Sequence, residues 1–154
     1  MKNSWTDDDF SQMSWHDNAV HGIRIIEGQY GSGEFVLDID YILEWLPKQD
    51  HEGGLRFRIA PAELRFHETT DLKIALDYAS ATAALTPFSI HQIQFEPIEY
   101  ENGIRSKRWR IEINWPVGEI TFQSPRLTQA LTGSAIVSDV QSLSDEQRAK
   151  LRGV

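Results

Sequence analysis

Cysteine is absent from this chain of 154 residues. Its absence excludes a disulfide framework, a catalytic thiol and any zinc site that needs sulfur ligands. No run of about 18 apolar residues occurs, and Asp7, Asp8 and Asp9 stand where a signal peptide would need an apolar segment. We therefore expect a soluble cytoplasmic protein with no membrane partner.

Positive charge is also scarce, because 15 Lys and Arg residues face 23 Asp and Glu residues for a net charge of -8. Such a chain repels phosphate backbones and anionic lipid. One basic strand surrounds Trp109, a pattern that single-stranded nucleic-acid binders use. Its alternation instead predicts that Arg108 and Arg110 face solvent and pair with acids such as Glu96 or Glu119. We expect no nucleic-acid binding.

Helical periodicity is nearly absent, and a period of two replaces it. Between Phe35 and Trp45 every odd position is apolar, whereas the even positions include Asp38, Asp40 and Glu44. A strand places these three acids on one face, but a helix would scatter them among the apolar residues. Similar alternation recurs in short blocks at 55–59, 64–66, 72–78, 90–95, 104–115 and 120–122. The phase changes at Pro61, which predicts a bend, bulge or strand break there. It changes again between Ile90 and Ile93, which predicts a second bulge or a change of pairing partner.

Turn and cap residues divide these blocks. Asn102-Gly103 predicts a type I′ hairpin that pairs residues 98–101 with 104–107. Residues 127–131 predict an edge strand, and Ser144 with Gln147 predicts the capping box of a helix at about 143–152. The fold class is therefore all-β, an antiparallel sandwich or open barrel of about eight or nine strands with a short C-terminal helix. We assign residues 15–154 to this single domain and residues 1–14 to a flexible acidic arm.

The densest polar cluster comprises four consecutive residues and a histidine three positions later: Trp15, His16, Asp17, Asn18 and His21. Imidazole and carboxylate groups without sulfur suit a divalent metal, and Asp38, Asp40, His51 or His67 could add ligands. A spaced motif such as H-E-x-x-H is absent. The alternative is structural: Asp17 or Asn18 closes a turn, His21 pairs with a neighbouring strand, and Trp15 covers the core.

Three further features have structural explanations. Asp38 and Asp40 lie about 6.5–7 Å apart on one strand face, which suits paired acid and base chemistry but is typical of a solvated sheet face. The loop from Gly28 to Gly33 leads into a strand rather than a helix, so it predicts a hairpin loop and not a phosphate site. Trp45, Trp109 and Trp115 are in phase with apolar neighbours and predict core, whereas Trp5 and Trp15 fit no period and are the aromatic candidates for binding.

Three sequence blocks carry a resemblance: W-H-D-N-x-x-H-G at 15–22, L-D-I-D-Y-I-L-x-W at 37–45 and A-P-A at 60–62. Through them the chain, over residues 15 to about 130, resembles a family of short uncharacterised bacterial proteins. The resemblance implies a bacterial cytoplasmic protein and transfers no functional residue.

Two functions follow from these observations. The first is a non-catalytic binding or protein-interaction module that needs no cofactor and that pairs with a partner, or with itself, through an edge strand at 127–131. The second is a metal-dependent hydrolase, or a metal-binding or ligand-binding protein, that uses His16, Asp17 and His21. They differ in whether those side chains converge on one centre.

Overall fold

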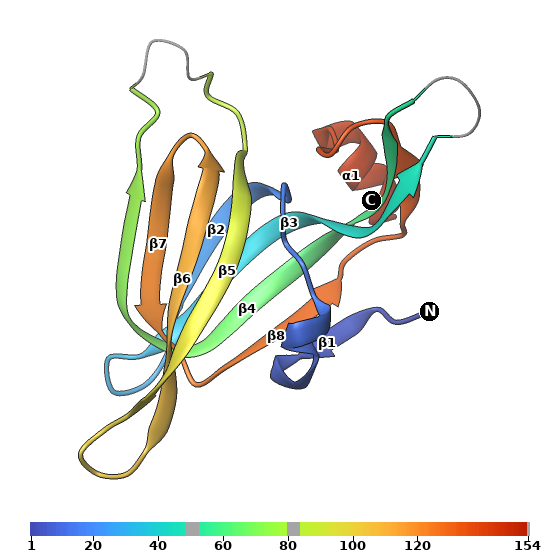
Figure 1. The fold of residues 1–154 in the computed structure, drawn as a ribbon. Coiled ribbons are helices and arrows are strands. Elements are labelled where there is room, and N and C mark those ends of the chain that lie inside the picture. The colour runs from blue at the N-terminus through green and yellow to red at the C-terminus, as the bar shows by residue number, and fades with distance from the viewer. Residues whose placement is uncertain (49–52, 80–83, 154) are drawn as a thin grey trace.

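The computed structural model describes residues 1–48, 53–79 and 84–153. It confirms an antiparallel all-β fold with a short C-terminal helix (Figure 1). The elements are β1 (Ser4–Thr6), η1 (Asp7–Gln12), β2 (Ala19–Glu27), β3 (Gly33–Pro47), β4 (Leu55–Leu76), β5 (Phe88–Glu99), β6 (Arg105–Trp115), β7 (Gly118–Gln123), β8 (Arg126–Leu131), β9 (Ile136–Ser138) and α1 (Asp145–Leu151). Neither helix of the described chain has the length and apolar composition needed to cross a membrane.

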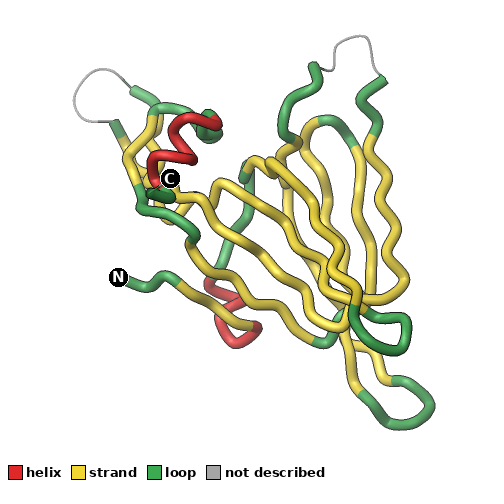
Figure 2. Tube along the Cα trace, turned by 180° about the vertical axis from the view of Figure 1, so that it is seen from behind, coloured by secondary structure: helices red, strands yellow, loops and turns green. Residues whose placement is uncertain are grey.

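One sheet contains all the strands and curls back on itself (Figure 2). Its order is β1-β8-β4-β3-β2-β5-β6-β7, and β7 pairs again with β4. The closure is possible because β4 changes neighbours along its length: it pairs with β9 at residues 57–59, with β8 at 62–67 and with β7 at 70–76.

Neither the strand break nor the bulge predicted at Pro61 is present, because β4 runs through this residue and Pro61 stays in register with Asp40. Proline lacks an amide hydrogen and is tolerated where strand pairing is interrupted. Pro61 occupies such a place, since it lies between the segments that pair with β9 and with β8. The bend comes later, near Glu68 and Asp71, whose φ angles are 49° and 54°.

Two predictions for β5 and for the turn that follows it have different outcomes. The phase change in β5 is confirmed as register shifts on both sides of Ile90. The type I′ turn is wrong: Gly103 has φ of 83°, but Asn102 is not among the left-handed residues, and the Gly103 amide donates to the Tyr100 carbonyl. The loop is one residue longer, so Ile98 pairs with Ser106.

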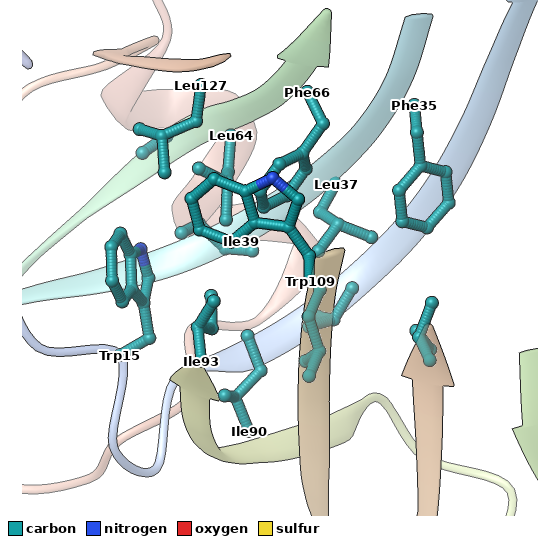
Figure 3. Close-up of a cluster of buried hydrophobic side chains, with 14 of the residues drawn as sticks. Trp15, Phe35, Leu37, Ile39, Leu64, Phe66, Ile90, Ile93, Trp109 and Leu127 are labelled. Atoms are coloured by element: carbon teal, nitrogen blue, oxygen red, sulfur yellow. The ribbon is translucent and has the colours of Figure 1, made fainter. Parts of the chain in front are cut away.

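The main core lies inside the curved sheet. Figure 3 shows Trp109 of β6 reaching across to Phe66 and Leu37 on the opposite strands. These three side chains are fully buried, as are Phe35, Ile39, Leu64, Ile90, Ile111, Ile120, Phe122 and Leu127. The alternation in residues 35–41 therefore identified the core face of β3 correctly.

The core prediction is wrong for two of the three tryptophans it covered, Trp45 and Trp115, and both candidates for an aromatic binding residue, Trp5 and Trp15, are buried. Trp45 and Trp115 are 38% and 45% exposed. The reason for Trp45 is a register shift between Ile42 and Glu44, which moves the following residues to the other face of the sheet. Trp115 lies at the last position of β6.

The N-terminal segment is docked, which differs from the flexible arm we expected. β1 pairs with β8, and Phe10 of η1 packs against Trp109 and Phe95 with ring centroids 5.7 and 4.9 Å apart. The wide spacing of its apolar residues did not indicate this, because Trp5 packs against Tyr41 whereas Phe10 packs against Trp109. β8 consequently lies between β1 and β4, so residues 127–131 do not form the free edge that we expected.

A second, smaller core forms on the outer face of β3. It contains Ile42, Phe57, Ile59 and, from the segment before α1, Leu143. The predicted capping box is confirmed: the Ser144 hydroxyl accepts from the Gln147 amide, and the Gln147 side chain accepts from the Ser144 amide.

Candidate functional site

His21 and Asp40, both predicted as binding residues, meet across β2 and β3. His21 Nε2 lies 2.6 Å from Asp40 Oδ2, and the same oxygen accepts from the Leu143 amide at 2.8 Å. The other oxygen, Oδ1, accepts from Arg148 of α1. Asp40 has no exposed surface and the Arg148 side chain is 4% exposed, so this is a buried ion pair.

Asp38 belongs to the same network. It accepts from Arg148, and from Arg152 Nη2 at 2.7 Å. The expectation that Asp38 and Asp40 form a solvated face is therefore wrong for Asp40. The physical reason is that the segment with α1 returns from the far end of the chain to one end of β3 and β4 (Figure 1), where Leu143 and Arg148 contact Asp40. These carboxylates hold α1 on the sheet.

His16 lies apart from this network. Its Nδ1 is 3.1 Å from the His91 carbonyl, its ring stacks against Trp45 at 6.0 Å, and its Nε2 is 3.5 Å from Asp17 Oδ2. His67 pairs with Glu34 instead, and His51 lies outside the described residues. In the described ranges no three His, Asp or Glu side chains form a group that could hold a metal ion. The geometry therefore gives no support to a metal site built on His16, Asp17 and His21.

Trp15 and Asn18 are structural in this fold. The Trp15 indole donates to Gln129 Oε1 at 2.8 Å within the core. Asn18 is fully buried, and its side-chain oxygen accepts from the Ile42 amide at 3.4 Å. Nearby, burial raises the pKa of Tyr41, and a hydrogen bond with the Ser14 backbone opposes this rise.

Like Asp38, which lines a different pocket, Asp17 lines an open pocket. Its φ of 61° is left-handed, a conformation that aspartate adopts more readily than most residues. Its amide donates to the Ile90 carbonyl at 2.7 Å. Its carboxylate accepts from Asn114 Nδ2 at 2.7 Å and from Gln141 Nε2 at 3.1 Å. Asp17 is thus fixed by residues that are about 100 positions away in sequence, beside a pocket of about 500 Å³.

A larger groove lies at the opposite end of the sheet and was missed. It measures about 920 Å³ between the loop at 28–34 and the hairpin at 100–106. Tyr30 and Glu68 line it in left-handed conformations, and Glu34, also in its wall, lies 2.9 Å from His67 Nδ1. Strained residues gather at functional sites more often than elsewhere. Alternation cannot reveal left-handed backbone in a tyrosine or glutamate, so the sequence carried no signal for this groove.

The remaining feature is the outer edge of β2. Residues Gly22–Glu27 pair with β3, but β5 joins β2 at Ala19 and Val20 alone among the described residues. Beyond Val20 the two strands diverge. The backbone groups of 22–27 that point away from β3 therefore have no strand partner in the part of the chain that the structure describes.

Comparison of the chain with protein-family models, with curated proteins and with solved structures found no match in any of the three.

Proposed function

We propose that this chain is a protein-interaction module in which two copies pair through the free edge of β2. The observation that carries the proposal is the exposure of Ile23 and Ile25. They stand opposite Leu37 and Phe35, which are fully buried, so all four side chains lie on the core face of the sheet. Ile23 and Ile25 are nevertheless 37% and 67% exposed.

An exposed and unprotected strand edge is unusual in a monomeric protein. Proteins protect exposed edges with lysine, proline, bulges or a covering segment, because free strands pair readily with other chains. Residues 22–27 contain neither lysine nor proline, and their bulge lies at the β5 end, between Val20 and Gly22. Elsewhere the chain does cover an edge, since β1 pairs along β8.

A second copy of this chain is a suitable partner for the edge of β2. Two identical antiparallel strands related by a twofold axis satisfy each other's hydrogen bonds, and six residues provide a contact of about 20 Å. When Ile25 stands opposite its own symmetry mate, Arg24 stands opposite isoleucine and no like charges are directly opposed. Ile25 then contacts its own symmetry mate, which removes part of its apolar side chain from water.

Sedimentation velocity over a range of protein concentrations tests the proposal. The mass should rise from 17.6 kDa toward twice that value. It should rise further with added salt, because each copy carries a net charge of -8. Ile25→Lys should hold the mass at the monomer value. Ile104→Lys is the matched control, because Ile104 is 58% exposed in the hairpin between β5 and β6 and should still associate.

Either of two results would overturn the proposal. The first is a wild-type mass that stays at the monomer value at every concentration. The second is association that Ile25→Lys leaves intact while circular dichroism shows both variants folded, because a different surface would then be responsible.

The cellular setting is part of the same proposal. We place the module in the bacterial cytoplasm, supported by the resemblance carried by residues 15–22 and 37–45 and by a fold stabilised without cysteine. No catalytic role is proposed, since the buried carboxylate of Asp40 and the half-buried carboxylate of Asp38 are both bound by Arg148.

A further inference from the structure

Asp17 differs in its surroundings from Asp40 and Glu63, two other buried or half-buried acids among the described residues. Asp40 is neutralised by Arg148, and the Arg65 guanidinium donates to Glu63 at 2.7 Å. The Asp17 carboxylate is 23% exposed. Its hydrogen-bond donors, Asn114 and Gln141, are both neutral amides.

No Lys or Arg nitrogen of the described residues lies within 4.0 Å of the Asp17 carboxylate. The ionisable neighbour is His16, whose Nε2 is 3.5 Å away and whose side chain is 47% exposed. A carboxylate offers about four lone-pair sites, and the two amides occupy two of them. Asp17 therefore presents a fixed negative charge with acceptor capacity to spare.

The pocket beside Asp17 has the composition of a site for a small polar cation. Its volume of about 500 Å³ falls within the range of small-molecule sites. Apart from Asp17, its lining residues are uncharged, and several carry hydroxyl or amide groups: Thr86, Ser89, Asn114, Gln141 and Ser142. These groups satisfy hydrogen bonds of a ligand without competing for its charge.

We infer that this pocket binds an organic cation, an alkylguanidinium or alkylammonium group, whose charged end pairs with Asp17. The carboxylate is already oriented by Asn114 and Gln141, so binding needs little rearrangement. A guanidinium suits the site best, because its planar donors can bond a carboxylate in a bidentate manner. The site is separate from the β2 edge, so this inference and the proposed self-association are tested independently.

The test uses two probes of nearly the same shape, butylguanidinium and the neutral butylurea. Each is titrated into the isotope-labelled full chain while the side-chain amide signals of Asn114 and Gln141 are followed by nuclear magnetic resonance. Butylguanidinium should shift these signals with saturation, and butylurea should bind at least about tenfold more weakly, because hydrogen bonds to charged groups are the stronger ones.

Asp17→Asn is the decisive variant, because asparagine tolerates the left-handed backbone and can still accept from Asn114. It should weaken butylguanidinium binding at least about tenfold. Glu96→Gln is the matched control: it removes one negative charge from an exposed acid that pairs with Arg108, and should leave binding unchanged. The inference is overturned if butylguanidinium does not bind, if both probes bind equally, or if Asp17→Asn binds as wild type does.

Discussion

Replacement of Arg148 by methionine probes the contact that holds α1 on the sheet. Arg148 is 3% exposed and donates to Asp40, to Asp38 and, at 3.3 Å, to the Ile39 carbonyl. Methionine keeps an apolar stem of similar length but removes the charge. Asp40 would then remain buried with His21 and the Leu143 amide as its partners.

Removing one partner of a buried ion pair costs about 3–5 kcal/mol, because the other charge stays buried and loses its guanidinium partner. In a domain of this size each kcal/mol corresponds to about 2–4 °C in Tm, so Arg148→Met should lower Tm by about 6–20 °C. Hydrogen exchange adds a local measurement. The Leu143 amide should lose protection first, because its acceptor is Asp40 Oδ2.

Arg152→Met is the matched control. Arg152 also belongs to the C-terminal segment and also binds Asp38, but its side chain is 30% exposed. Exposed ion pairs contribute about 0–1 kcal/mol, so its Tm should fall by no more than a few degrees. Equal effects of Arg148→Met and Arg152→Met on Tm and on Leu143 exchange would refute the conclusion that burial makes the Asp40 contact dominant.

Three further predictions concern other parts of the fold. Phe10→Ala should lower the free energy of unfolding by about 2–4 kcal/mol in urea denaturation, because the ring packs on Trp109; an unchanged midpoint would show that η1 is not docked in solution. Gly103→Ala should cost about 1–2 kcal/mol, since φ is 83°; a smaller effect would show that the turn adapts. A hydrogen bond from Arg65 holds the pKa of Glu63 below its usual value near 4.5. The Tm advantage of wild type over Glu63→Gln should therefore be constant above that pH and disappear as the pH falls through the lowered pKa. An advantage that persists in acid would contradict this assignment.

Much of the architecture was predictable because it depends on local patterns. Alternation between Phe35 and Tyr41 identified both a strand and its core face, since side chains on a strand point to opposite sides in turn. Ser144 and Gln147 marked the start of α1, because a capping box is formed by residues three positions apart. The phase change after Ile90 likewise marked a bulge that is present.

The candidate site was predictable only in part. Asp17 was identified as a polar candidate, but its two amide donors come from residues 114 and 141, which no local pattern connects to it. In the sequence, Asp40 occupies a polar position of an alternating strand, as an exposed acid would. Its burial depends on Arg148, which lies 108 positions later. Sequence alternation shows which residues share a face, but not what covers that face.

The sequence by itself thus determined the strands, the core face of β3, the C-terminal helix and the absence of thiol and disulfide chemistry, because each depends on composition or on neighbours within a few residues. Only the tertiary structure decided which edges are paired, which acids are buried and which aromatic residues reach solvent. Those properties come from contacts between distant segments: η1 against Trp109, β1 along β8, α1 over Asp40, and the divergence of β5 from β2 after Val20. Each such contact is decided by the closure of the whole sheet, which a local pattern does not encode.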